Sequence, residues 1–171
     1  TAGFRTIMFT DMAGSTEATQ RLGDARAREI VRRHNRAVRS ALHMHHGEEI
    51  KHTGDGIMAA FTSATQAVEC AADIQRRLRD ETELQVRIGL NAGEPVAEGG
   101  DLFGTSVQLA SRVCTLAEAQ QILVTDVIRQ LVAGKGFLFS DRGETVLRGF
   151  EDPVRVYELE WRDSGGIGDD A

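Results

Sequence analysis

The chain has 171 residues and a formal net charge of −6, with a hydrophobic share of 41% and a charged share of 27%. These values are typical of a single globular domain that buries a core without disulfides. The acidic balance argues against a large surface that tracks phosphates, so we expect no nucleic-acid partner. No apolar run approaches the length of a membrane span, and no signal peptide opens the chain.

Hydrophobic periodicity and turn residues predict alternating strands and helices. In the first half of the chain we expect a strand at 4–10, a turn at 11–16, a helix at 24–45, strands at 49–52 and 57–61 joined by a tight turn at 53–56, and a helix from 63 to about 79. In the second half we expect a strand at 84–91, a glycine-rich loop or small hairpin at 92–104, a helix at 105–117, a strand at 121–125, a short helix at 126–131, and a terminal hairpin that ends in a strand at 154–160.

This order, β-α-β-β-α-β with an appended α/β segment, indicates a ferredoxin-like core. We therefore predict an α+β fold, an α/β sandwich with an antiparallel-rich sheet. Such a fold serves many functions, so function has to be argued from particular residues. The two cysteines, Cys70 and Cys114, fall in helical patterns and are expected to be buried thiols in a reducing compartment.

Four local patterns with chemically useful residues follow one another along the chain. They are FTDMAGST with Asp11, EIKHTGDG with Lys51 and Asp55, GDLFGTSVQLASR with Asp101, Gln108 and Arg112, and LRGF with Arg148. Each pattern alone is weak, because a strand-end aspartate or a Gly-Asp-Gly hairpin needs no function. Their joint order and spacing are the specific signal.

In these motifs the chain resembles the catalytic domain of class III adenylyl cyclases, from about Phe4 to Trp161. We assign residues 1–162 to this domain and expect the Gly- and Asp-rich residues 163–171 to form a disordered tail. The resemblance implies an adenylate cyclase, a lyase of signal transduction that converts ATP to 3′,5′-cyclic AMP and pyrophosphate. It also implies two divalent metal ions, Mg²⁺ or Mn²⁺, as cofactors.

Asp11 and Asp55 are the expected metal ligands. Hard cations such as Mg²⁺ and Mn²⁺ favour carboxylate oxygens, and two carboxylates at adjacent strand ends are able to hold a pair of ions over a triphosphate. The resemblance assigns both aspartates this role. The backbone amides of Met12, Ala13 and Gly14, near a predicted helix start, are further candidates for binding phosphate oxygens.

Lys51 and Asp101 are the expected base-reading pair. Adenine presents a ring-nitrogen acceptor beside an amino donor, which a lysine donor and a carboxylate acceptor complement. Guanine reverses this pattern. In the resembling family this pair selects the base, and lysine followed by aspartate is its adenine-selecting form.

Gln108 and Arg112 lie four residues apart and share one helical face. The resembling family carries asparagine and arginine at these positions, where the asparagine orients the ribose and the arginine stabilises charge at the α-phosphate. Arg112 matches, whereas Gln108 departs by one methylene, and a positioning error of that size costs about a hundredfold in rate. Arg148 lies where the family often has a basic residue near the β- and γ-phosphates.

The resemblance also implies a symmetric homodimer with both active sites at the interface. The metal aspartates of each site come from one chain, and the lysine and arginine come from its partner. Because the sequence begins with Thr1 and a strand-like run follows at once, we expect a domain excised from a longer parent. We expect a cytoplasmic catalytic domain, with regulatory or sensor segments and an optional membrane anchor in the parent.

Several alternatives remain open. A catalytically weak or silent member that binds ATP or a partner domain is favoured by Gln108 and opposed by the retained aspartates, Lys51 and Arg112. Lys51 argues against a guanylyl cyclase, since an ammonium group cannot accept from the guanine N1–H. The signature of diguanylate cyclases, another ferredoxin-like class, is absent. A plain interaction module predicts no metal-dependent nucleotide binding.

The histidines suggest a different site. His43, His45 and His46 cluster near a predicted helix end, and His34 lies upstream. A transition-metal site is conceivable, but no regular ligand spacing supports it, so we expect a solvated helix end. His52 alternates with Lys51 along a strand and is expected to point away from the candidate active site.

Overall fold

The computed structural model describes residues 3–13, 20 and 23–162. Within these residues the strands are β1 (Arg5–Ala13), β2 (Glu48–His52), β3 (Ile57–Phe61), β4 (Gln85–Gly93), β5 (Val96–Glu98), β6 (Asp101–Phe103), β7 (Ile122–Thr125), β8 (Phe139–Thr145) and β9 (Val154–Leu159). The helices are α2 (Asp24–Met44), α3 (Ala64–Leu78), α4 (Thr105–Leu116) and α5 (Asp126–Leu131). The predicted tail at 163–171 lies outside the described residues.

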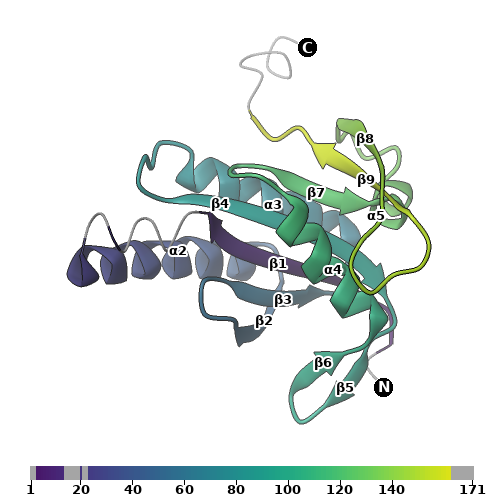
Figure 1. The fold of residues 1–171 in the computed structure, drawn as a ribbon, viewed down its shortest axis with the longest axis horizontal. Coiled ribbons are helices and arrows are strands. Elements are labelled where there is room, and N and C mark those ends of the chain that lie inside the picture. The colour runs from purple at the N-terminus through teal and green to yellow at the C-terminus, as the bar shows by residue number, and fades with distance from the viewer. Residues whose placement is uncertain (1–2, 14–19, 21–22, 163–171) are drawn as a thin grey trace.

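The main sheet has seven strands in the order β2-β3-β1-β4-β7-β9-β8 (Figure 1). Strand β1 lies between β3 and β4 and is antiparallel to both, while β4 and β7 run parallel. The part β2-β3-β1-β4 with helices α2 and α3 has the predicted ferredoxin-like connectivity. Strands β7, β9 and β8 extend this core at the β4 edge. The predicted α+β fold is therefore confirmed.

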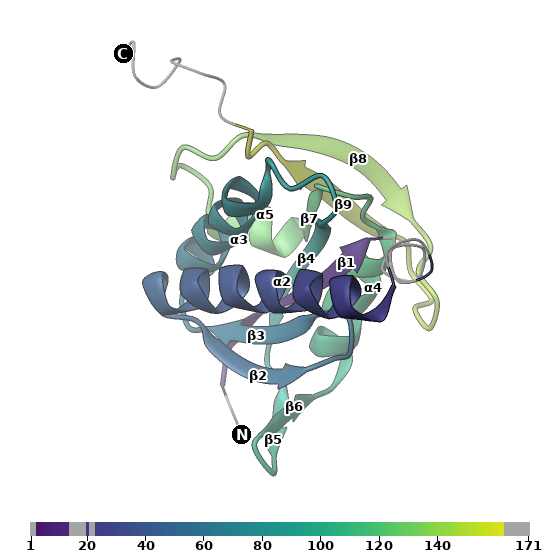
Figure 2. The same ribbon diagram turned by 90° about the vertical axis from the view of Figure 1, so that its left-hand side faces the viewer.

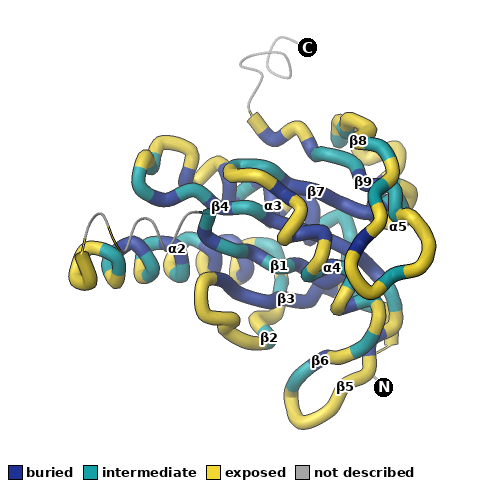
Figure 3. The backbone as a smooth tube through the Cα atoms, in the orientation of Figure 1, coloured by how far each residue is buried: buried dark blue, intermediate teal, exposed yellow. Residues whose placement is uncertain are grey.

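Helices α2 and α3 cover one face of the sheet and α4 covers the other (Figure 2). Met8 of β1 belongs to the core beneath α2 and α3, whereas its neighbour Ile7 packs with Val107 and Ala110 of α4. Successive side chains of a strand point to opposite faces, so β1 supplies both cores. Figure 3 shows the inner strands as buried and the edge strand β2 as largely exposed.

The structure corrects one predicted boundary that matters for function. Strand β1 continues to Ala13 instead of ending at Thr10, because it pairs with β4 along its whole length, from Arg5↔Gly93 to Ala13↔Gln85. The predicted turn is therefore wrong for residues 11–13.

Other local predictions are confirmed. The Ser63 side chain caps α3 by accepting a hydrogen bond from the Gln66 amide at 3.1 Å. The glycine-rich segment forms the small β5–β6 hairpin, whose turn residues Gly99 and Gly100 have φ of 59° and 79°.

The two cysteines are free and buried, as expected, and burial raises the pKa of each thiol to about 12. In the described part of the chain, no helix is both long enough and apolar enough to cross a bilayer.

Candidate active site

Asp11 projects to the face of the sheet that α4 covers. Met12 belongs to the core beneath α2 and α3, so its neighbour Asp11 points the opposite way. The Met12 amide donates to the backbone carbonyl of Asp55 at 3.0 Å. The expectation that this amide binds a phosphate is therefore corrected, because its hydrogen bond is already made. Ala13 ends a strand and does not begin a helix, and Gly14 lies outside the described residues.

An arginine that the sequence reasoning missed pairs with Asp11. Arg87 lies directly opposite Asp11 in the β1–β4 ladder. Its Nη2 and Nε both donate to Asp11 Oδ2, at 2.6 and 3.1 Å, and its Nη1 donates to the Thr115 carbonyl at 3.0 Å. Cross-strand opposite charges stabilise a sheet, and a guanidinium fits a carboxylate or a phosphate equally well. Arg87 thus orients the Asp11 carboxylate and links it to the last turn of α4 through the Thr115 carbonyl.

Asp55 sits in the tight turn between β2 and β3, as the sequence predicted. The Thr53 amide donates to the Gly56 carbonyl at 2.8 Å, and the Asp55 amide donates to the Thr53 carbonyl at 3.0 Å. Because the Asp55 carbonyl accepts from Met12, one backbone hydrogen bond joins this turn to the residue after Asp11. Two carboxylates on neighbouring segments are the kind of oxygen donors that suit Mg²⁺ or Mn²⁺. The donor set therefore fits the metal ions that the resemblance implies.

Replacing Gly56 by alanine should lower the thermal midpoint by about 6–12 °C, or about 3 kcal/mol of stability. A Cβ at this position would lie 1.7 Å from the Thr10 carbonyl oxygen, so β1 or the turn must move. Calorimetry checks this, with Gly99→Ala as the matched control. A Cβ at Gly99 meets open space, and only its φ of 59° is strained, which costs about 1 kcal/mol. Equal losses in both variants would contradict the close approach.

Lys51 and Asp101 come together although they are far apart in the sequence. Lys51 Nζ donates to Asp101 Oδ2 at 2.9 Å and lies 5.8 Å from the ring centroid of Phe103. The β5–β6 turn places Asp101 within reach of β2, and the Leu102 amide donates to Asp101 Oδ1 at 2.7 Å. The hydrogen bond from Lys51 holds the pKa of the Asp101 carboxyl below its usual value. The pair therefore presents a donor beside an ionised acceptor.

Gln108 and Arg112 are exposed on α4, one turn apart. Arg112 Nε donates to the Arg148 carbonyl at 3.2 Å, so the segment after β8 lies against α4. The structure thus brings Arg148 close to Arg112 through its backbone.

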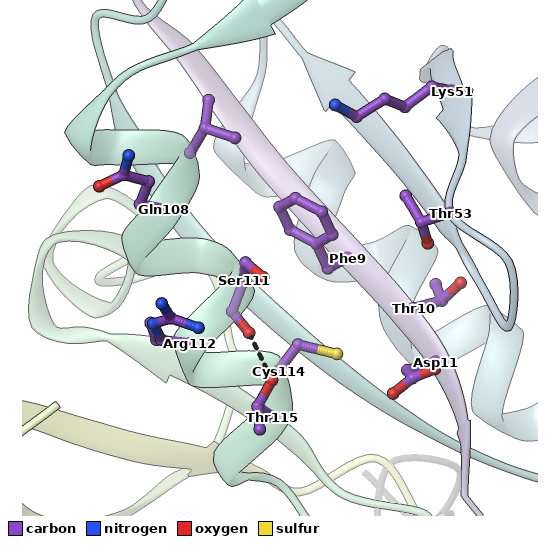
Figure 4. Close-up of a pocket in the computed structure, with 11 residues that line it drawn as sticks. Phe9, Thr10, Asp11, Lys51, Thr53, Gln108, Ser111, Arg112, Cys114 and Thr115 are labelled. Atoms are coloured by element: carbon purple, nitrogen blue, oxygen red, sulfur yellow. Dashed lines mark hydrogen bonds between the residues drawn. The ribbon is translucent and has the colours of Figure 1, made fainter. Parts of the chain in front are cut away.

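These elements surround a hollow of about 450 Å³ between β1, β2 and α4. Its lining includes four of the predicted site residues, namely Asp11, Lys51, Gln108 and Arg112. Figure 4 shows Lys51 and Asp11 on one side of Phe9 and the two α4 residues on the other. Asp55, Asp101 and Arg148 are not part of the lining; they adjoin it through the contacts described above.

His34 is the second functional candidate that the sequence reasoning misjudged. Its side chain is fully buried beneath the sheet, not solvated, and burial lowers its pKa. His34 Nε2 lies 3.2 Å from the hydroxyl of Thr10, and Nδ1 lies 2.9 Å from Asn35 Oδ1. Its helix spacing signalled burial, since it lies four residues from both Ile30 and Val38.

The other histidines lie near the end of α2 and in β2. His43 and His46 are exposed near the end of α2, as expected, whereas His45 is half-buried and pairs with Asp73 at 2.9 Å. His52 faces α2, where its Nε2 lies 3.4 Å from Asn35 Oδ1, which confirms that it points away from Lys51. Among the residues that the structure describes, no three His, Cys, Asp or Glu side chains gather as metal ligands.

Comparisons with known proteins show the family to which the chain belongs. The family model described as adenylate and guanylate cyclase catalytic domain matches residues 3–161. The protein Rv2212 of Mycobacterium tuberculosis is 33% identical over 154 residues, which cover 90% of this chain and 40% of that protein. The chain spans only 28% to 40% of the length of the first curated relatives that it matches.

Solved structures give the same result. The adenylate/guanylate cyclase/hydrolase from Silicibacter pomeroyi is 31% identical with a TM-score of 0.77, covering 91% of this chain and 95% of that one. The guanylate cyclase domain of RhGC from Catenaria anguillulae, solved in complex with GTP, has a TM-score of 0.85 at 21% identity, covering 93% and 97%. The second likeness concerns the fold alone. Because the similar solved structures include adenylate and guanylate cyclases, the fold alone does not indicate whether the substrate carries adenine or guanine.

Proposed function

The chain belongs to the adenylate and guanylate cyclase catalytic domain family, and on this premise we propose that it converts ATP to 3′,5′-cyclic AMP and pyrophosphate. The observation that carries the choice of ATP is the contact between Lys51 and Asp101 at 2.9 Å. A donor beside an acceptor complements the adenine edge, where a ring-nitrogen acceptor adjoins an amino donor. Guanine would oppose its N1–H to the lysine ammonium and its O6 to the carboxylate.

Asp11 and Asp55 are proposed to hold two divalent cations, Mg²⁺ or Mn²⁺. When bound, such ions acidify the ribose 3′-hydroxyl and stabilise charge on the leaving pyrophosphate. The chain contributes by orienting the Asp11 carboxylate through Arg87 and by holding the backbone of Asp55 in its turn. Arg87 would share the Asp11 carboxylate with a bound cation, and its guanidinium also suits a phosphate oxygen.

Arg112 is proposed to stabilise negative charge at the α-phosphate as the ring closes, and Gln108 to orient the ribose. Fixed donors aimed at developing charge are among the largest contributions to catalysis. The Arg148 carbonyl holds the Arg112 side chain through Nε, which leaves the guanidinium terminus for phosphate. Arg148 itself is proposed to meet the β- and γ-phosphates.

We also propose that two copies of the chain share each site. This proposal comes from the family resemblance, in which opposite chains supply the metal aspartates and the lysine and arginine. The rim of the pocket supports it, because the β5–β6 hairpin exposes Val96 (56%) and Phe103 (46%) next to Asp101. Exposed apolar groups beside a polar site are typical of surfaces that a partner covers. Cytoplasmic location, and regulation by segments of a longer parent, stay predictions.

Replacing Lys51 by glutamate should lower kcat/KM for ATP by a hundredfold or more, on the order expected when a base-reading donor becomes a repelling acceptor. The relative use of GTP should rise. Quantifying cyclic AMP and cyclic GMP by mass spectrometry checks this. Lys135→Glu is the matched control, because Lys135 is the only other lysine and lies exposed beyond α5. An unchanged ATP preference in the Lys51 variant would rule out its role in base selection.

Gln108 favours a second candidate, a weak or silent domain that binds ATP without efficient turnover. We expect Gln108→Asn to raise kcat by about tenfold to a hundredfold, because the shorter amide restores the family's spacing. Gln130→Asn, at an exposed position of α5, is the control. Steady-state rates at saturating ATP and metal measure the effect. A silent wild type with an active Gln108→Asn variant would establish the second candidate, whereas equal rates would show that the glutamine is fully accommodated.

A further inference from the structure

The backbone ladder between β1 and β3 stops just before the proposed metal site. Its final registered pair is Phe9↔Met58, and the next step is made by a side chain. Thr10 Oγ1 accepts a hydrogen bond from the Ile57 amide at 3.0 Å. Thr10 is only 2% exposed, so this bond is shielded from water. A single buried hydroxyl therefore joins Thr10 to Ile57, between the last ladder pair and the backbone hydrogen bond from Met12 to Asp55.

His34 on α2 completes the bonding of that hydroxyl. Asn35 Oδ1 only accepts hydrogen bonds, so the proton of the neutral imidazole lies on Nδ1, which is 2.9 Å away. Nε2 is then an acceptor, and the Thr10 hydroxyl, 3.2 Å away, donates to it. The same Asn35 oxygen lies 3.4 Å from His52 Nε2. One orientation of protons satisfies the whole chain of contacts from Ile57 through Thr10 to His34 and Asn35.

This network spans the three strands that carry the proposed site. Thr10 precedes Asp11 in β1, Ile57 begins β3 after Asp55, and His52 follows Lys51 in β2. We propose that His34 is a positioning residue, which acts through Thr10 to hold Asp11 and Asp55 at the spacing that binds the metal ions. The inference rests on the proposed function, because it assigns His34 a task in that same site. His34 itself lies on the opposite face of the sheet and touches no substrate.

A side chain that fills the volume of the His34 imidazole without a hydrogen-bond acceptor would not hold the Thr10 hydroxyl in place. A phenyl ring at position 34 is close to the imidazole in volume, but it removes the Nε2 acceptor of the Thr10 hydroxyl and leaves it the Ile57 carbonyl alone. The hydroxyl would then turn toward the Ile57 carbonyl, which is 3.5 Å away, and loosen its bond with the Ile57 amide. Groups that orient metal ligands from behind typically contribute about tenfold to a hundredfold in metal affinity.

The test measures Mn²⁺ binding and activity separately. His34→Phe and the wild type are titrated with Mn²⁺ in the presence of 3′-deoxy-ATP, which lacks the attacking hydroxyl, and free Mn²⁺ is followed by electron paramagnetic resonance. We expect His34→Phe to weaken Mn²⁺ binding about tenfold. With ATP, the Mn²⁺ concentration for half-maximal activity should rise by the same factor, while kcat at saturating Mn²⁺ falls less than threefold. Hydrogen exchange at the Ile57 amide should accelerate.

Three further variants separate positioning from general stability. His34→Gln offers an amide oxygen near the place of Nε2 and should bring Mn²⁺ binding to within about threefold of the wild type. Val38→Ala removes buried volume one turn along α2 and should lower stability without changing the Mn²⁺ affinity. Thr10→Val should mimic His34→Phe, and combining the two should add little, because both act through one hydroxyl. Thr10→Val also replaces His34→Phe as the test if the latter does not fold.

The outcomes distinguish this inference from the proposed function. Wild-type Mn²⁺ affinity in His34→Phe, fully additive effects of the His34 and Thr10 variants, or an equal loss of affinity in Val38→Ala would each overturn the positioning role. A wild-type chain that binds Mn²⁺ with 3′-deoxy-ATP but forms no cyclic nucleotide would count against the proposed reaction while leaving the positioning role intact. A wild-type chain that binds no Mn²⁺ would overturn both.

Discussion

Asp55→Asn should reduce cyclase turnover by at least about a thousandfold, or about 4 kcal/mol of transition-state stabilisation, because the amide lacks the charge that holds a divalent cation. The fold should survive. Asparagine suits the same turn, and the backbone bonds to Thr53 and Met12 do not involve the side chain. Initial rates with saturating ATP and Mn²⁺ measure the loss, and a thermal midpoint within a few degrees of the wild type shows that the structure is retained.

Asp80→Asn makes the same chemical change at an exposed position just after α3, outside the lining of the pocket. It should leave the turnover within about twofold of the wild type, as is usual for surface substitutions. Substantial cyclic AMP formation by Asp55→Asn would contradict the assignment of Asp55 as a metal ligand. If the activity of Asp55→Asn recovered at high Mn²⁺ concentration, the variant would have a weakened metal site and not a lost one.

A heterodimer of Asp55→Asn with Arg112→Ala should recover about half of the wild-type activity, although each variant alone is nearly inactive. In the mixed dimer one site combines both defects, and the other joins an intact Asp55 from one chain with an intact Arg112 from its partner. Co-expression with two different affinity tags isolates this species, and cyclic AMP formation per dimer gives the measurement.

This complementation depends on sharing between chains. If each chain held a complete site of its own, both sites of the mixed dimer would be defective, and the activity would stay near zero. A heterodimer of Asp55→Asn with Asp11→Asn is the matched control. Asp55 and Asp11 both belong to the metal-binding half of a site. Each of the two interfacial sites therefore has one defective metal-binding half, and no recovery is expected. Recovery in this control would contradict the division of residues between the chains.

Local patterns predicted most of the fold because the elements are short and clearly bounded. The capping pattern at Ser63 and the two glycines at 99–100 each specify their structure through neighbouring residues. The error at the end of β1 has a tertiary cause. The residues Asp11, Met12 and Ala13 read as a turn, yet β4 offers partners along the whole strand and keeps them extended. Pairing between distant strands outweighed local preference.

The sequence predicted those residues of the candidate site that belong to the four motifs. Asp11, Lys51, Gln108 and Arg112 line one hollow, and Asp101 reaches it through its contact with Lys51. Arg87 was missed because its role depends on the register that sets it opposite Asp11.

His34 was missed for a similar reason. It was grouped with the exposed histidines downstream, whereas its burial depends on α2 packing across β1. The helical spacing of His34 indicates a buried face, but neither its contact with Thr10 nor the pairing of Arg87 with Asp11 is encoded locally, because both join segments far apart in sequence.

The most direct measurement is cyclic nucleotide formation by the wild-type chain from ATP and from GTP, with Mn²⁺ and then Mg²⁺, at high protein concentration. The proposed function predicts cyclic AMP from ATP, little cyclic GMP from GTP, and no product when the metal is chelated. Preferential cyclic GMP formation would contradict the reading of Lys51 and Asp101. No product from either nucleotide, by a chain that still binds ATP with Mn²⁺, would contradict the catalytic role itself.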